Sequence, residues 1–258
     1  LKINVPVNGK CYLKLIYHLK KEVPLLDEDH ILGFDEIEVS KDNAKCKLAE
    51  KWLQKTAVGS ELQVNENDTQ IHIKGREFAY TIDKRTALFT EMKFAGREYL
   101  NHPMELNIWR APTDNDMYIK SEWKKAHYDR AYTRAYTTEV VQGRHGVKII
   151  SHASVVAKTV QKILDVMIAW KIDDIGRILP RFGVRMFLDK KLTDARYFGM
   201  GPQESYRDKH QAASHGLYRA NVGDLHEDYI RPQENGSHYD CEYVELNNSR
   251  YGIVVSAE

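Results

Sequence analysis

The sequence predicts a mainly β protein, in which a small β-sandwich precedes a much larger domain of antiparallel strands. Apolar and polar residues alternate along most of the chain, and this period of two is typical of strands that bury one face. Polar segments that contain glycine separate the alternating runs, as turns do between strands. Helical spacing occurs in one short stretch.

The small sandwich is predicted from the start of the chain. Residues 13–19 carry leucine or tyrosine at alternate positions, and residues 36–39 alternate glutamate with isoleucine or valine. We expect strands with one buried face in both segments. Between residues 54 and 67 apolar residues become scarce while glycine, serine and asparagine accumulate, which indicates a domain boundary. The predicted domains are therefore residues 1–59 and residues 60–258.

A β-hairpin is predicted at the start of the larger domain. Residues 71–74 and residues 78–82 each alternate between apolar and polar side chains, with Gly75 between them and a polar turn over residues 83–86. Two alternating runs around a glycine are typical of an antiparallel hairpin.

Two longer alternating runs follow later in this domain. They cover residues 164–170 and residues 182–188, and the polar, glycine-containing residues 173–176 separate them. Long antiparallel strands explain this pattern best. We expect Trp170, at the end of the first run, to lie in the core.

One helix is predicted over about residues 121–135. Trp123, Ala126 and Arg130 recur at three- and four-residue steps, and Ser121 is suited to cap the first turn. Among the tryptophans, Trp123 is the one we expect to be exposed.

The charge balance excludes several classes of partner. The 258 residues include 38 basic and 37 acidic side chains, which gives a formal net charge of +1. Nucleic acids and anionic membranes attract proteins through an excess of basic residues, so neither is expected as a partner. The apolar runs are also too short to cross a bilayer.

The ends of the chain and its cysteines bear on its location. Leu1 stands where a natural start has methionine, and Glu258 ends a predicted strand, so both ends look truncated. No secretion signal is visible, which makes the cytoplasm the default expectation, although the truncation leaves the location open. Cys11, Cys46 and Cys241 are widely spaced, which favours reduced thiols over a disulfide framework or a zinc site.

Three polar motifs carry a family resemblance. They occupy residues 107–116, residues 201–208 and residues 229–236, and in this order they resemble the C-terminal part of the family 2 β-galactosidases. Residues 30–39 resemble the end of the immunoglobulin-like linking domain of those enzymes, and nearly all of residues 60–258 resembles their small-chain domain. The resemblance implies an immunoglobulin-like β-sandwich followed by a galactose-mutarotase-like antiparallel supersandwich that is truncated at its C-terminus.

The resemblance also implies a function for a parent protein. Such enzymes hydrolyse terminal β-D-galactosides such as lactose with retention, through two glutamates of an upstream barrel. By this resemblance the present chain holds no catalytic residue and no metal, because the magnesium and sodium ligands also lie upstream, and it is inactive alone. Its expected partners are the upstream barrel and sandwich domains, the galactoside, and further copies in a homo-oligomer.

The loop after the first motif is the candidate contact with substrate. In the family it reaches the active-site mouth and moves as substrate passes from shallow to deep binding, and here it covers residues 117–125. A family glycine that lets it switch falls near Tyr118, whose bulk restricts the backbone. Turn chemistry alone favours a loop that caps the sheet. The candidate mouth residues are Asp114, Asn115, Asp116, Met117, Tyr118 and Trp123.

Glu204 and Glu234 resemble a glycosidase pair, since hydrolysis needs two carboxylates. Each follows Pro-Gln and has charged neighbours, which favours ion pairs or loop-ordering hydrogen bonds instead. The charged neighbours that suggest such ion pairs or hydrogen bonds are Arg207, Asp208, Arg231 and Asp240. The motif residues predicted to be structural are Trp109, Arg110, Pro112, Gly201, Pro202, Gln203, Glu204, Tyr206, Asp208, Pro232, Gln233, Glu234, Asn235 and Gly236.

Two other functions stay open. The first is a free-standing carbohydrate-binding or aldose-mutarotase-like module, in which His210, His226 or His238 acts with Glu204 or Glu234 as acid and base in the supersandwich cleft. The second is a purely structural scaffold whose loop never reaches a sugar. A closed metal site is disfavoured, because the histidine and carboxylate runs lack ligand spacing.

Overall fold

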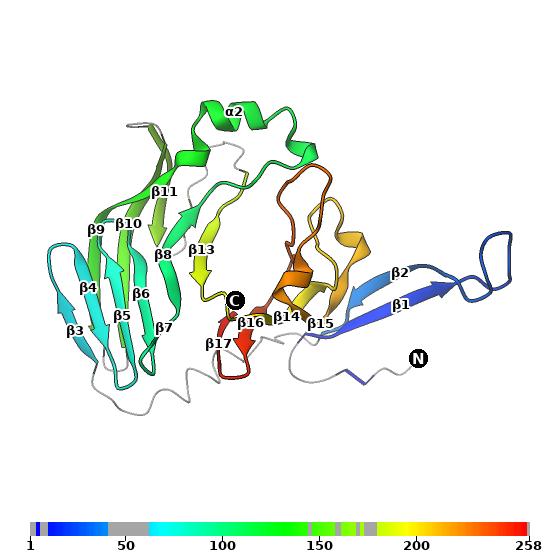
Figure 1. Cartoon of the computed structure of the whole chain (residues 1–258), viewed down its shortest axis with the longest axis horizontal. Helices are drawn as coiled ribbons and strands as arrows, with labels where there is room; N and C mark the ends of the chain where they lie inside the picture. Colours follow the sequence, from blue (N-terminus) through cyan, green and yellow to red (C-terminus); the bar gives the residue numbers. More distant parts are fainter. Residues whose placement is uncertain are drawn as a thin grey trace. The chain divides into compact units, whose positions relative to one another are not determined.

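The chain is mainly β, with antiparallel pairing throughout its described strands, as the sequence predicts (Figure 1). The computed structural model describes residues 4–5, 10–40, 62–143, 146–157, 161–168, 171–172 and 180–256, with the backbone alone for residues 161–168 and 171–172.

The chain divides into two compact units. The first comprises Leu1–Ala57, Thr193–Glu227 and Gly236–Glu258, and the second comprises Val58–Leu192 and Asp228–Asn235. The predicted domain boundary near residue 60 lies outside the described residues and stays a prediction.

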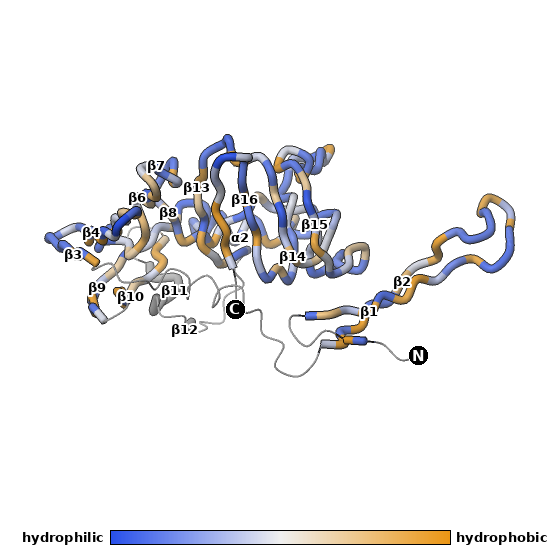
Figure 2. Tube along the Cα trace, turned by 90° about the horizontal axis from the view of Figure 1, so that it is seen from below, coloured by the Kyte–Doolittle hydropathy of each residue, from blue (hydrophilic) through white to orange (hydrophobic). Residues whose placement is uncertain are grey.

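A two-stranded ribbon opens the first unit. It consists of β1 (Tyr12–His18) and β2 (Ile31–Glu38), which pair antiparallel. Hydrophobic and hydrophilic residues intermingle along both strands (Figure 2). The two predicted strands are therefore present.

The expectation that the ribbon buries one face is wrong for the described residues. Leu15 and Tyr17 are 39% and 47% exposed on one face, and Ile16 is 48% exposed on the other. Alternating side chains become buried only where a second layer covers them, and the described contacts between the ribbon and the rest of its unit gather near Tyr12.

A four-stranded sheet forms the rest of the first unit. Its order is β15-β14-β16-β17. Ala195 and Tyr197 of the central strand β14 are 4% and 3% exposed, so this strand lies in the core. The strands are β14 (Asp194–Gly201), β15 (Ser214–Asn221), β16 (Tyr243–Asn248) and β17 (Tyr251–Ser256).

His215 of β15 joins the ribbon to this sheet. Its Nδ1 lies 2.5 Å from Oε1 of Glu36, and its Nε2 lies 2.9 Å from Oδ2 of Asp240. The ring of Tyr12 stacks on the His215 ring, with centroids 4.0 Å apart. The ribbon is thus fixed to the sheet by hydrogen bonds of His215 to two carboxylates and by aromatic packing.

The second unit begins with a five-stranded sheet in the order β3-β4-β5-β6-β7. The predicted hairpin is confirmed as β4 and β5, and Ile71, Ile73 and Ile82 on its inner side are 0%, 8% and 3% exposed. The strands are β3 (Gln63–Glu66), β4 (Gln70–Lys74), β5 (Phe78–Asp83), β6 (Leu88–Phe94) and β7 (Arg97–Glu98).

A second sheet packs against this hairpin. Its order is β12-β11-β10-β9, and Val140, Val147 and Ile149 from its two longest strands contact the buried isoleucines. The two sheets therefore enclose an apolar layer, as in a β-sandwich. The strands are β9 (Tyr132–Gly143), β10 (Gly146–Ala157), β11 (Gln161–Ile168) and β12 (Lys171–Ile172).

The two long runs predicted late in the second domain are strands. The first is β11, and the second is β13 (Gly183–Leu188), which pairs with β8 (Leu100–Asn107). Trp170 and the turn predicted over residues 173–176 lie outside the described residues.

The predicted helix is shorter than expected. It covers only α2 (Lys120–Lys125), flanked by short 3-10 turns η1 (Asp114–Asp116) and η2 (Tyr128–Arg130). Ser121 lies inside α2 rather than at its cap, and its hydroxyl donates to the Tyr118 carbonyl at 3.0 Å. His127 takes a left-handed conformation with φ 59°, which ends the helix.

Two further findings concern the described residues. None of their helices is long and apolar enough to span a membrane. Cys11 and Cys241 are free thiols, and burial raises the pKa of Cys241 to about 11, whereas Cys46 lies outside the described residues.

Candidate functional site

The first motif folds into a turn around the buried carboxylate of Asp116. One guanidinium nitrogen of Arg110 donates to both Asp116 oxygens, at 2.8 and 2.9 Å. The backbone amide and the hydroxyl of Thr113 donate to Oδ2 of the same carboxylate, at 2.9 and 3.1 Å. Asp116 is only 6% exposed, so its carboxylate interacts with groups of the turn rather than with solvent.

Trp123 anchors the following segment in the core. It is 3% exposed, and its ring meets that of Trp109 edge to face, with centroids 6.4 Å apart. Ile108 and Val155 belong to the same apolar cluster. The expectation that Trp123 is exposed is therefore wrong, because α2 turns its tryptophan inward.

Between these two anchors the turn presents an exposed tip. Met117 and Tyr118 are 51% and 84% exposed, and Asp114 and Asn115 are also exposed. Four of the six candidate mouth residues therefore lie at the surface. The other two, Asp116 and Trp123, are buried and fix the turn and the helix that follows it.

The third motif contacts the first within the second unit. Oε1 of Gln233 accepts a hydrogen bond from the Asp114 amide at 2.9 Å. The Glu234 amide donates to the Ala111 carbonyl at 3.2 Å, and the Glu234 carboxylate forms an ion pair with Arg181. Two motifs far apart in the sequence therefore share one surface.

The second motif forms a separate hydrogen-bonded loop in the first unit. The Glu204 carboxylate is paired with Lys209 and accepts from the Gly236 amide at 2.8 Å. The Ser205 amide donates to the Ser237 carbonyl at 2.6 Å. These contacts order the loop around Glu204, which is 9% exposed.

The other motif residues support these loops or lie at the surface. A Cβ on Gly201 would lie 2.5 Å from the Tyr197 hydroxyl, so a larger residue there would require the neighbouring tyrosine rings to shift. The Asn235 amide donates to the Gln233 carbonyl at 3.1 Å. The motif residues that are partly buried are Pro112 and Tyr206, and those at the surface are Pro202, Gln203, Asp208 and Pro232.

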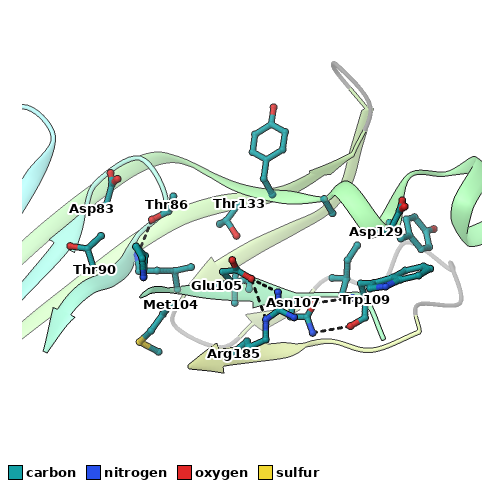
Figure 3. Close-up of a pocket in the computed structure, with 17 residues that line it drawn as sticks. Asp83, Thr86, Thr90, Met104, Glu105, Asn107, Trp109, Asp129, Thr133 and Arg185 are labelled. Carbon is teal, nitrogen blue, oxygen red and sulfur yellow. Dashed lines mark hydrogen bonds and ion pairs between the residues drawn. The ribbon is translucent and has the colours of Figure 1, made fainter. Parts of the chain in front are cut away.

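A cavity of about 550 Å³ lies in the second unit, between the β5–β6 turn, β8 and the start of β9 (Figure 3). Leu88 and Ile108 contribute apolar surface to it, and Tyr132, which is 53% exposed, also lines it. Glu105 and Arg185 form an ion pair across β8 and β13 beside the cavity. The lining is thus a mixture of apolar, aromatic and charged groups.

Comparison with known proteins identifies the family. A family model described as "Beta galactosidase small chain" matches residues 74–258. The chain belongs to the β-galactosidase small-chain family. The family match covers the five-stranded sheet from the end of β4 onward and all three motifs.

Individual proteins that are similar in sequence to the chain are also named beta-galactosidase. A beta-galactosidase of Actinobacillus pleuropneumoniae is 37% identical over 264 residues, covering 96% of this chain and 26% of the relative. Beta-galactosidases of Staphylococcus xylosus and Lactobacillus delbrueckii subsp. bulgaricus are 28% and 29% identical, covering 95% and 96% of this chain. The chain spans 26%, 26% and 25% of the length of these three relatives.

In this small-chain member, Glu204 and Glu234 are each engaged with a basic partner that the sequence did not single out. Their partners are Lys209 and Arg181, while Asp240 pairs with His215. Arg181 is 53 positions from Glu234, so no local pattern could have identified it.

The histidines considered for mutarotase chemistry do not line the described cavity. His238 packs on Tyr197 with ring centroids 4.3 Å apart, and His210 stacks on Tyr239. Burial lowers the pKa of His238, against the opposing charge of Glu204. Among the described residues no group of three potential ligands is arranged to hold a metal ion.

Proposed function

We propose that this chain is a noncatalytic part of a longer, retaining β-galactosidase of glycoside hydrolase family 2, which hydrolyses terminal β-D-galactosides such as lactose. The observation that carries the proposal is the small-chain match over residues 74–258. The beta-galactosidases that resemble the chain are about four times its length, which leaves room for a separate catalytic domain.

A noncatalytic role agrees with the state of the two motif glutamates. Retaining hydrolysis needs two carboxylates about 5 Å apart, one of which attacks the sugar while the other donates a proton. Glu204 and Glu234 instead each carry a basic partner. We assign the catalytic glutamates, and the magnesium and sodium ligands of the parent protein, to its upstream barrel.

The segment over residues 117–125 is proposed to line the active-site mouth of the parent protein. A loop that contacts substrate needs a fixed base and an accessible tip. The base here is held by Asp116 and Trp123, and the tip exposes Met117 and Tyr118.

The ribbon of β1 and β2 is proposed to pack against the upstream domains of the same protein. Ile16, Ile31 and Leu32 are 48%, 58% and 58% exposed, so packing against another domain would remove apolar surface from water. A cytoplasmic homo-oligomer is our proposal for the assembled enzyme. With a net charge of +1, neither nucleic acid nor a membrane is proposed as a partner.

A carbohydrate-binding module is the second candidate function, favoured by the cavity beside Tyr132. Its volume of about 550 Å³ lies in the range of small-molecule sites. Binding of galactose to the chain, without any effect of the chain on hydrolysis by the upstream domains, would favour this function over the first.

The proposed function is tested by hydrolysis of a chromogenic β-galactoside. The parent protein is expected to hydrolyse it, and Tyr118→Ala at the exposed tip is expected to change KM or kcat without lowering the melting temperature. A parent protein that leaves β-galactosides intact would overturn the proposal.

A further inference from the structure

A short segment of the third motif, residues 233–235, is hydrogen-bonded to the turn of residues 111–116. This segment is called the strap below. Gln233 is 119 positions from Asp114, yet its side-chain oxygen accepts the Asp114 amide at 2.9 Å. Three residues before Asp114, the Ala111 carbonyl accepts the Glu234 amide at 3.2 Å. Two consecutive strap residues thus bind both sides of one turn.

The bond to Asp114 satisfies a donor that the turn cannot satisfy itself. Asp114 is the first residue of η1, and the first amides of a helical turn lack acceptors within it. The local cap, Thr113, uses its hydroxyl on Asp116. The Gln233 amide oxygen therefore takes the position of a capping group supplied from a distant part of the chain.

The strap is itself held in place. The Glu234 carboxylate forms an ion pair with Arg181, and the Asn235 side chain donates to the Gln233 carbonyl at 3.1 Å. Both contacts leave the Gln233 side chain directed to Asp114. Because these contacts hold the strap, the position of the strap determines where the Gln233 oxygen can accept from the Asp114 amide.

The attachments of the turn differ in burial. Asp116 is held from within by Arg110 and Thr113, whereas the bond between Gln233 and Asp114 lies at the surface. A surface hydrogen bond is readily exchanged for one to water, so this attachment is the one that can open while the turn stays folded.

We propose that Gln233 is a positioning residue that sets the resting place of the exposed tip, residues 114–118. Its effect on catalysis rests on the proposed function, in which this tip meets the substrate. Its effect on the turn does not, because that follows from the hydrogen bonds alone. The two consequences can therefore be measured separately.

The experiment compares Gln233→Ala with Gln203→Ala in the parent protein. Gln203 is the control, because it also stands between proline and glutamate; its side chain is exposed, whereas Gln233 is half-buried. Gln233→Ala is expected to raise amide hydrogen exchange in residues 114–118 about threefold to tenfold, the effect of losing one hydrogen bond, and to raise KM for the galactoside with the melting temperature nearly unchanged. Gln203→Ala is expected to change none of these.

Gln233→Glu retains an acceptor at the same position and is expected to restore most of the protection and of KM. Unchanged exchange in Gln233→Ala, or equal effects in the two alanine variants, would overturn the positioning role. Faster exchange with unchanged KM and kcat would uphold the positioning of the turn and overturn its proposed place at the active-site mouth.

Discussion

Arg110 donates from a single guanidinium nitrogen to both carboxylate oxygens of Asp116, at 2.8 and 2.9 Å, across six positions of the chain. This pair closes the turn that precedes α2. Because Thr113 binds the same carboxylate, removing its charge affects the whole turn.

Asp116→Asn is expected to lower the free energy of unfolding by about 1–3 kcal/mol, because it weakens a buried, charge-assisted hydrogen-bond network. Urea denaturation measures this loss. Asp114→Asn is the control, since its side chain is exposed and a change there is expected to stay within about 0.5 kcal/mol. Equal losses in the two variants would contradict the account of the turn.

Trp123→Ala is expected to cost about 3–5 kcal/mol, because it leaves a cavity in a packed cluster. Tyr118→Ala, only five positions away but 84% exposed, is expected to change stability by less than about 0.5 kcal/mol. Thermal unfolding of both variants checks the contrast. A mild effect of Trp123→Ala would mean that the helix does not turn this ring into the core.

Glu204→Gln and Glu234→Gln are expected to lower the stability of the parent protein by about 1–3 kcal/mol each, because Lys209 and Arg181 lose their partners. Turnover of a chromogenic galactoside at a temperature well below unfolding is expected to stay close to that of the unchanged protein. Loss of turnover with unchanged melting would defeat the structural role of these two glutamates.

The pH dependence of stability is expected to carry a contribution from His238. Burial lowers the pKa of this ring, so below the ordinary histidine value of about 6.5 the unfolded chain binds a proton that the folded chain does not. The stability from this group is present above about pH 6.5 and is lost as the pH falls through the lowered pKa.

His238→Gln is therefore expected to flatten the fall in stability between about pH 7 and pH 5. Urea denaturation across this range provides the comparison. A steeper fall in His238→Gln would contradict the direction of the shift.

The sequence was most informative where local geometry decides the structure. The hairpin of β4 and β5 could be predicted because alternation and Gly75 both act within a few residues. A Cβ on Gly75 would lie 2.3 Å from the Phe78 ring, so a larger residue there would displace this ring. The mainly β fold follows from the same alternation repeated along the chain.

Predictions that depended on distant contacts were less accurate. Three- and four-residue spacing suggested a helix as far as residue 135, but His127 adopts a left-handed conformation that spacing cannot reveal, and β9 begins at Tyr132. Trp123 lies on a short helix whose orientation is set by Trp109 and Ile108. Arg181, the partner of Glu234 at a separation of 53 positions, was missed for the same reason.

The most direct test of the central claim is complementation of hydrolysis. This chain is assayed with a chromogenic β-galactoside alone, and again after mixing with a protein that carries the upstream domains. The account predicts no hydrolysis by the chain alone and activity in the mixture above that of the upstream part. Hydrolysis by the chain alone would contradict it, and Glu204 and Glu234 would then be the first residues to replace.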